Sequence, residues 1–256
     1  MPEPLSQTPL TRPRVTPRSG PPWAAALRVV LVVLVAVGVA GMLVVWQYNL
    51  GSQARMVMTV LASTSYVLLA LAGAGLLTGF GRFTVAALIL CWLGDLLGPA
   101  AFKVGLLAFL LAHLAWIGAF CCRGVDARRL LAAFPLGVCA SGVTFYRVFP
   151  HVPPDEAAVV LAYTLVITAM LVTACSSRAG AAYRLILLGA VIFYVSDVFV
   201  ARARYISPGR INQFIGYPLY YGSCVLLALS VYVQSREARP EGWRLRGDRP
   251  ASSHTP

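Results

Sequence analysis

Charged residues are scarce in this sequence, and acidic residues are scarcer than basic ones. Only 12% of its 256 residues are charged, 59% are hydrophobic, and just nine are Asp or Glu. A soluble core of this length carries more charge, so the composition excludes an ordinary water-soluble domain. It is typical of a chain that crosses a membrane several times.

Two other features are missing. The sequence has no strand-like alternation of apolar and polar residues, which excludes a transmembrane β-barrel. Its cysteines lie in or at the ends of apolar runs without the paired spacing of a zinc site, so we predict no disulfide and no metal. The six cysteines are Cys91, Cys121, Cys122, Cys139, Cys175 and Cys224.

Long apolar runs recur along the chain instead. A run of about 20 apolar residues crosses a hydrocarbon core about 30 Å thick, and its backbone must satisfy its own hydrogen bonds as a helix. We therefore predict an all-α, polytopic membrane helix bundle. It forms a single domain over residues 23–235, and no cofactor is expected. The eight predicted spans cover residues 24–46, 56–78, 83–99, 102–120, 129–148, 156–175, 180–201 and 212–234.

Polar tails flank this bundle. Residues 1–22 contain seven prolines and several arginines, which predicts a disordered basic tail. Residues 236–256 form a second basic tail. Most of the 21 basic residues lie in the tails or in connections on the same side, so both termini are predicted to be cytoplasmic. The orientation of the spans thereby accounts for the net charge of +12, and nucleic acid is not expected as a partner. We expect the protein in a cell membrane, either the plasma membrane or a bacterial inner membrane.

Asp95 and Asp197 are the two acids that lie inside long apolar runs. A carboxylate in hydrocarbon costs at least ~2.5–3.5 kcal/mol, so each needs a reason to be there. At ~1.5 Å per residue, Asp95 lies ~18 Å along its span and Asp197 ~24 Å along its own, and both spans run outward. Two acids at similar depth in the outer half of the bilayer are candidates for one shared site. A purely structural role, in which each carboxyl group bonds a neighbouring Tyr or Ser, is the alternative.

Aromatic and polar residues accompany the two aspartates. Tyr194 and Ser196 lie beside Asp197 in the seventh span. Phe109 and His113 lie on one stripe of the fourth span, and either His113 or Tyr194 could hydrogen-bond a carboxylate. Tyr220 and Tyr221 lie in the eighth. These residues could line an apolar small-molecule site. Packing, or an interfacial aromatic belt for the tyrosines, is the competing interpretation.

Basic residues near the outer ends of the spans suggest a headgroup site. Arg202, Arg204 and Arg210 follow the Asp197 span, and the arginine fork suits lipid phosphates. A solvated loop is the plainer explanation. Lys103 lies about two helical turns from Asp95, so a contact between the two is possible.

The ordered set of motifs resembles the YhhN-like lysoplasmalogenase family over about residues 25–234. Gly94-Asp95 followed by Phe109 and His113 resembles its first signature, and Ser196-Asp197 its second. The Tyr220-Tyr221 segment resembles its last helix, although Cys224 stands where we would expect glutamine. The resemblance implies hydrolysis of the vinyl ether bond of lysoplasmalogens, with the two aspartates as important residues.

Such a reaction begins with protonation of an alkene carbon and continues with addition of water. It needs one acid that stays protonated and one negative group, which a pair of carboxyl groups in a dry pocket can supply. Our hypothesis is that Asp197 is the general acid and Asp95 the ionised partner, although the sequence permits the reverse. The substrate would be a lyso-ether phospholipid.

Two other classes of function compete with this one. A proton-coupled transporter could use an intramembrane Asp pair, but the sequence has neither an inverted repeat nor broken spans at matching positions. A non-catalytic membrane scaffold is disfavoured by the matched depth of the two acids. The oligomeric state does not follow from the sequence.

Overall fold

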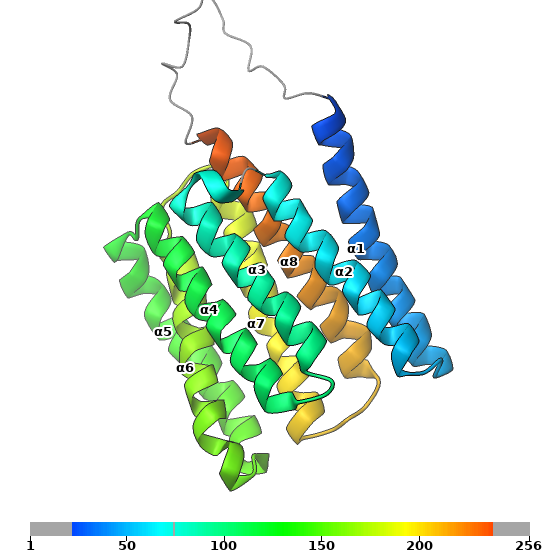
Figure 1. Ribbon diagram of the computed structural model, residues 1–256. Coiled ribbons are helices and arrows are strands. Elements are labelled where there is room, and N and C mark those ends of the chain that lie inside the picture. The colour runs from blue at the N-terminus through cyan, green and yellow to red at the C-terminus, as the bar shows by residue number, and fades with distance from the viewer. Residues whose placement is uncertain (1–21, 74, 238–256) are drawn as a thin grey trace, which may run out of the picture.

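The computed structural model describes residues 22–73 and 75–237, and these form a bundle of long helices (Figure 1). The predicted tails at 1–21 and 238–256 lie outside the described residues. Eight of the described helices are long and apolar enough to cross a membrane. They are α1 (Pro22–Tyr48), α2 (Ser52–Ala72), α3 (Gly79–Leu97), α4 (Phe102–Arg123), α5 (Ala127–Val148), α6 (Pro154–Ser176), α7 (Tyr183–Tyr205) and α8 (Ile211–Glu237).

The helices pack in antiparallel pairs: α1 with α2, α3 with α4, α5 with α6 and α7 with α8. Helices α2, α3, α7 and α8 lie together, and α4 and α6 close the far side of the bundle, while α1 and α5 lie at opposite flanks (Figure 1). The start of α1 lies beside the end of α8, where the Arg28 guanidinium stacks 3.8 Å above the Tyr232 ring. The start of the first helix and the end of the last therefore lie on the same side of the bundle, as an even number of spans requires.

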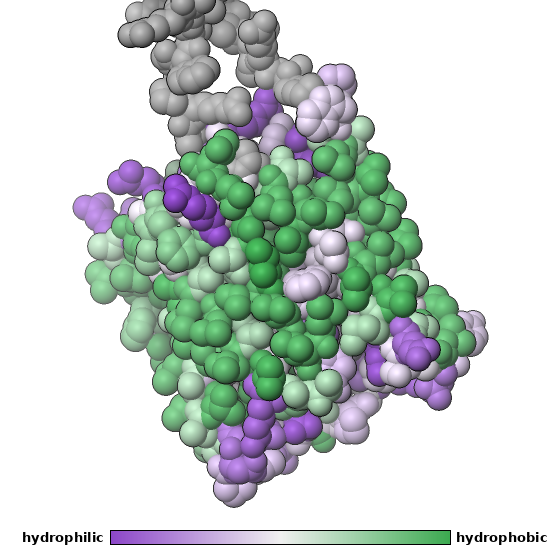
Figure 2. Space-filling view, in the orientation of Figure 1, coloured by the Kyte–Doolittle hydropathy of each residue, from purple (hydrophilic) through white to green (hydrophobic). Residues whose placement is uncertain are grey.

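The outer surface of the bundle suits lipid. Large apolar side chains are exposed along every long helix, among them Val33, Leu107 and Leu165. Figure 2 shows apolar residues over most of the middle of one face, with hydrophilic residues gathered toward its ends. An exposed apolar band between polar ends is what a bilayer demands. The structure confirms the predicted all-α fold of an integral, multi-pass membrane protein.

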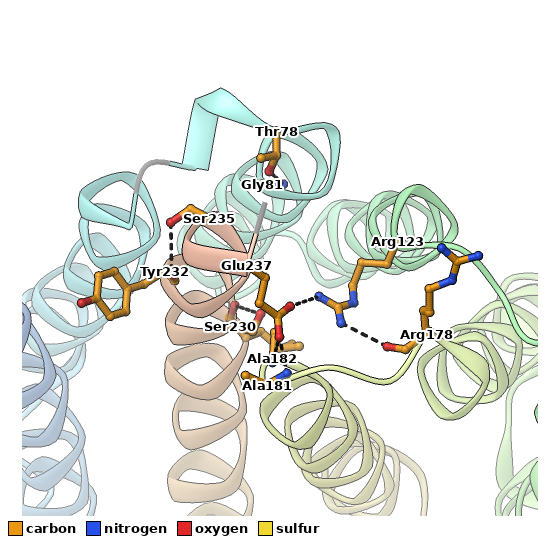
Figure 3. A network of polar contacts seen from close by, with 11 residues as sticks. Thr78, Gly81, Arg123, Arg178, Ala181, Ala182, Ser230, Tyr232, Ser235 and Glu237 are labelled. Atoms are coloured by element: carbon orange, nitrogen blue, oxygen red, sulfur yellow. Dashed lines mark hydrogen bonds and ion pairs between the residues drawn. The ribbon is translucent and has the colours of Figure 1, made fainter. Parts of the chain in front are cut away.

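The second predicted span, residues 56–78, began and ended too late in the chain. Helix α2 ends at Ala72, and a short 3-10 helix (Gly75–Leu77) leads into α3. The helix ends before this turn because the backbones of Gly75 and Gly81 are in contact. A Cβ on Gly81 would come within 2.2 Å of the Gly75 oxygen. Thr78 then caps α3 by accepting the Gly81 N–H at 3.0 Å (Figure 3).

A polar cluster ties the helix ends together on the side of the chain termini (Figure 3). The Glu237 carboxylate, at the end of α8, accepts the N–H groups of Ala181 and Ala182 just before α7. It also pairs with Arg123 at 3.4 Å, and Arg123 donates to the Arg178 carbonyl at 3.1 Å. Helix α8 thus continues to Glu237, whereas the basic tail was predicted to begin at residue 236.

Glycines let α3 and α4 approach closely next to Asp95. A Cβ on Gly105 would come within 2.5 Å of the Gly98 Cα and 3.0 Å of its nitrogen, and backbone atoms cannot rotate away. Small residues allow this kind of contact between membrane helices. The close approach fixes the short turn that holds the end of α3, and with it Asp95, against the bundle.

Replacing Gly105 should therefore destabilise the protein. We expect Gly105→Leu to lower stability by about 1–3 kcal/mol or more, since overpacked backbone has to shift. The midpoint of thermal unfolding in detergent measures the effect. Gly142→Ala in α5 is the matched control, because a Cβ there meets nothing within 4 Å. Equal midpoints for the two variants would contradict this packing argument.

Candidate active site

Asp95 lies in the last turn of α3 and is surrounded by hydroxyl groups. Its Oδ2 atom accepts hydrogen bonds from Ser63 Oγ at 2.5 Å, Tyr66 Oη at 3.1 Å, Tyr220 Oη at 3.1 Å and Tyr221 Oη at 3.4 Å. Ser63 and Tyr66 come from α2, and the two tyrosines from α8. No hydrogen bond joins Oδ1 to the described residues, so this oxygen is available to a ligand or water.

The hydroxyl groups around Asp95 also contact one another. Tyr66 and Tyr220 lie 3.3 Å apart through their oxygens, and Ser63 and Tyr221 lie 3.4 Å apart. All four residues are buried, so their orientation is fixed by packing. Several donors converging on one oxygen stabilise an ionised carboxylate. The arrangement thus favours the negative form of Asp95.

Asp197 has far fewer partners. It lies on α7, and its Oδ2 accepts one hydrogen bond, from Tyr163 Oη of α6 at 2.6 Å. Nε2 of His113 lies 3.7 Å from the same oxygen. Among the described residues Oδ1 has no hydrogen-bond partner. About 16% of the Asp197 side chain is exposed, enough for a small molecule to reach it.

The orientation of His113 follows from its other nitrogen. Nδ1 lies 2.6 Å from the Phe109 carbonyl oxygen, one turn earlier in α4. A carbonyl oxygen can only accept, so Nδ1 carries the proton and Nε2 of the neutral ring is an acceptor. The ring is completely buried among Trp116, Tyr163 and Phe193, and Nε2 has no hydrogen-bond partner in the described residues. An acceptor facing a carboxyl group suits a protonated Asp197.

Both aspartates line the same cavity of about 540 Å³. Its volume falls in the range of small-molecule sites, and most of its wall is apolar or aromatic with a few polar groups, as such sites usually are. The cavity extends to the helix ends on the side away from the chain termini. The lining residues include Trp46, Arg55, Asp95, Phe109, Phe145, Val160, Tyr163, Ile167, Tyr194, Asp197, Arg204, Tyr217, Tyr220 and Tyr221.

The model of the YhhN family matches residues 56–231, more than half of the chain and a stretch that contains both aspartates. The chain belongs to the YhhN family. No solved structure matches it.

Several curated relatives support this membership. The chain is 30% identical over 154 residues to the human protein named Lysoplasmalogenase TMEM86B, covering 59% of this chain and 64% of that protein. The protein of the same name from Sus scrofa is 28% identical, with 63% and 68% covered. A Mycobacterium tuberculosis protein named Lysoplasmalogenase is 30% identical, with 61% and 62% covered. The chain thus spans slightly less than two thirds of the human and mycobacterial relatives.

Two residues that were predicted to accompany Asp197 in the site make other contacts. Tyr194 lines the cavity, but its hydroxyl contacts Ser141 at 3.1 Å and Thr144 at 3.3 Å on α5, and neither aspartate. Ser196 is fully buried and donates to the Phe193 carbonyl at 2.7 Å. Because adjacent residues of a helix point about 100° apart, Ser196 faces away from the cavity that Asp197 lines. We therefore remove Ser196 from the site.

The expected arginine clamp is also not formed as predicted. Arg202 donates to the Asn212 side chain at 2.9 Å and does not line the cavity. Arg204 lines it but pairs at 2.9 Å with Glu156, a buried acid in the first turn of α6. Lys103 pairs at 2.7 Å with Asp155 and not with Asp95.

Three of the five hydroxyl groups on the aspartates were not predicted from the sequence: those of Ser63, Tyr66 and Tyr163. Ser63 and Tyr66 lie three residues apart on α2, a spacing that puts them on one helix face. That spacing was a usable signal. Tyr163 lies in an apolar run, where no spacing to another site residue could have indicated its role. In the described part of the chain, no cluster of His, Cys, Asp and Glu suits a metal ion.

Proposed function

We propose that this protein hydrolyses the vinyl ether bond of lysoplasmalogen-type lipids. The products are a fatty aldehyde and a glycerophospho-headgroup. Relatives at about 30% identity are named lysoplasmalogenases. The observation that carries the proposal is one apolar cavity lined by two carboxyl groups in different hydrogen-bond environments.

Asp197 acts as the general acid in this proposal. Its Oδ1 proton moves to the second carbon of the alkenyl chain, and the first carbon becomes an oxocarbenium ion. Tyr163 holds the Oδ2 side through its hydrogen bond, so that Oδ1 stays directed to substrate. A positioned acid contributes typically about 10²–10⁴-fold to such a rate.

Asp95 acts as the negative partner. Its carboxylate stabilises the oxocarbenium ion and takes a proton from water as the water oxygen bonds to the first carbon. The hemiacetal then breaks its bond to the glycerol oxygen, which receives the proton that Asp95 took from water. The hemiacetal hydroxyl gives its own proton to Asp197 as the aldehyde forms. One water is consumed and no electrons are exchanged. Fixed donors around Asp95 Oδ2 keep it ionised at little reorganisation cost. These environments favour Asp197 as the acid over the reverse assignment.

Tyr163→Phe tests the support given to the acid. The change keeps the ring and removes the only hydroxyl group recorded on Asp197 among the described residues. We expect kcat to fall about tenfold, the equivalent of one hydrogen bond of about 1.4 kcal/mol, with KM nearly unchanged. Tyr146→Phe, on the exposed surface of α5, should leave both constants unchanged. A Tyr163→Phe rate within twofold of the unsubstituted protein would remove Tyr163 from the mechanism.

Hydrolysis and transport are separated by one assay. Purified protein in detergent is given lysoplasmalogen, and free aldehyde is measured. A hydrolase releases aldehyde, whereas a carrier releases none because transport needs a sealed membrane. Absence of aldehyde across ethanolamine and choline headgroups would refute the proposed activity.

A further inference from the structure

Arg55 occupies a distinctive position on α2. Arg55, Thr59, Ser63 and Tyr66 follow one another at intervals of four, four and three residues, so they share one face of the helix. Ser63 and Tyr66 bind Asp95, and Arg55 lies about 12 Å nearer the outer helix end than Ser63, at ~1.5 Å per residue. Arg55 itself lines the cavity. The same helix face therefore carries a cation near the start of α2 and, deeper in the bundle, two hydroxyl groups that donate to the Asp95 carboxylate.

Two cations, Arg55 and Arg204, are found among the described residues that line the cavity. Arg204 is neutralised by Glu156, which also accepts from Tyr205 at 2.8 Å. The Arg55 guanidinium has no carboxylate within ion-pair distance and no hydrogen-bond acceptor in the described residues. It lies 4.9 Å from the centre of the Trp46 ring, an arrangement that orients it without neutralising its charge. Arg55 is partly buried and has no anion beside it among the described residues, so it can donate charge-assisted hydrogen bonds to an anionic ligand in the cavity.

The start of α2 adds to the positive potential here. Gly51, the residue before the helix, has a positive φ of 95° and provides no side-chain cap. The first N–H groups of α2 are therefore not satisfied by a capping side chain, and the helix dipole places partial positive charge at this end. Ser52, the first residue of α2, lines the cavity with Arg55. Helix N-termini with a nearby arginine are suited to phosphate.

We propose that Arg55, at the start of α2, binds the phosphate of a single-chain ether lipid and sets the selectivity of the cavity for phosphate-bearing substrates. This inference rests on the proposed function for the identity of the lipid. It assigns to Arg55 the role that the sequence suggested for Arg202 and Arg204. Arg204 is instead a structural residue that holds α7 to α6 through Glu156.

The order of the groups along the cavity matches such a lipid. Arg55 lies near the start of α2 and Asp95 lies deeper, beside Ser63, so a phosphate at Arg55 directs the glycerol and the ether bond toward the aspartates. The hydrocarbon chain continues along the apolar wall formed by Phe145, Val160 and Ile167. A lipid with two chains would have to place the second one on the polar side of the cavity, near the hydroxyl groups around Asp95.

The test uses ligands that are not hydrolysed, so it does not depend on the activity. We would titrate purified protein at fixed detergent concentration with 1-O-alkyl-glycerophosphocholine and with 1-O-alkylglycerol, which lacks the phosphate, and follow tryptophan fluorescence. We expect the phosphate ligand to bind at least tenfold more tightly, and Arg55→Gln to reduce this preference to less than twofold without changing the Kd of the alkylglycerol. Arg55→Lys should keep part of the preference. Arg147→Gln, an exposed arginine at the same end that does not line the cavity, should keep all of it.

Three results would overturn the proposal. The first is a preference that survives in Arg55→Gln, and the second is equal weakening of both ligands, which would make Arg55 structural. The third is displacement of the lipid by millimolar inorganic phosphate, which would make this a site for free phosphate. If lysoplasmalogen is not hydrolysed but the preference depends on Arg55, the headgroup site stands and the hydrolase proposal fails. If it is hydrolysed, Arg55→Gln should raise KM about tenfold with kcat retained.

Discussion

Asp197→Asn should lower kcat for aldehyde release by about 10²–10⁴-fold, the usual contribution of a positioned general acid. Asparagine has the same shape as aspartate and can still accept the Tyr163 hydrogen bond, but it has no carboxyl proton to transfer to carbon. The ring of His113 keeps its position through the Phe109 carbonyl. Substrate binding should therefore change little, and KM should stay within about twofold.

Aldehyde production by purified protein, trapped as a hydrazone and followed over time, measures this effect. Asp155→Asn is the matched control, since it removes an exposed carboxylate that pairs with Lys103 and does not line the cavity. Its kcat should equal that of the unsubstituted protein. An Asp197→Asn variant that elutes as folded protein and still turns over at more than a tenth of the normal rate would refute the role of Asp197.

Asp95→Asn should reduce kcat by about 10²–10³-fold, the range seen when a group that stabilises transition-state charge is removed. The loss has a different origin from that of Asp197→Asn. The neutral amide no longer offsets the oxocarbenium charge or accepts a proton from water. It also places an N–H donor near hydroxyl groups that were arranged to donate to a carboxylate.

A graded series separates charge from packing at Asp95. Tyr66→Phe and Tyr220→Phe each remove one donor and keep the rings, so each should lower kcat by about three- to tenfold, in line with about 0.5–1.5 kcal/mol per hydrogen bond. If these variants lose as much activity as Asp95→Asn, Tyr66 and Tyr220 are needed to maintain the fold, and the loss of kcat does not come from the charge of Asp95. Stability in detergent, measured beside kcat, distinguishes the two cases.

Hydropathy alone predicted the eight helices, because the length of an apolar run is set by bilayer thickness. It placed α4 and α5 within a few residues, and it failed at the end of α2. There the break depends on Gly75 and Gly81 touching across a turn, a tertiary contact with no signature in local hydropathy. The sidedness of the bundle and the disorder of the tails remain predictions.

The site was predictable where a residue is rare in its surroundings. A carboxyl group in an apolar run is conspicuous, so Asp95 and Asp197 were found at once, and both line the cavity. Hydroxyl residues are common in membrane helices, so the sequence did not distinguish Ser63 and Tyr163 from their neighbours. Arg202 and Arg204 were assigned by position alone. Their partners Asn212 and Glu156 come from other helices, and only the packed structure brings them together.

Mass spectrometry of the aldehyde formed in D2O tests the central claim most directly. Purified protein is mixed with lysoplasmalogen in D2O, and the aldehyde is trapped at once to prevent exchange. The proposed mechanism predicts one deuterium on the second carbon of each aldehyde, and no release above the buffer rate from the double variant Asp95→Asn/Asp197→Asn. Aldehyde without deuterium, or turnover by the folded double variant, would contradict it.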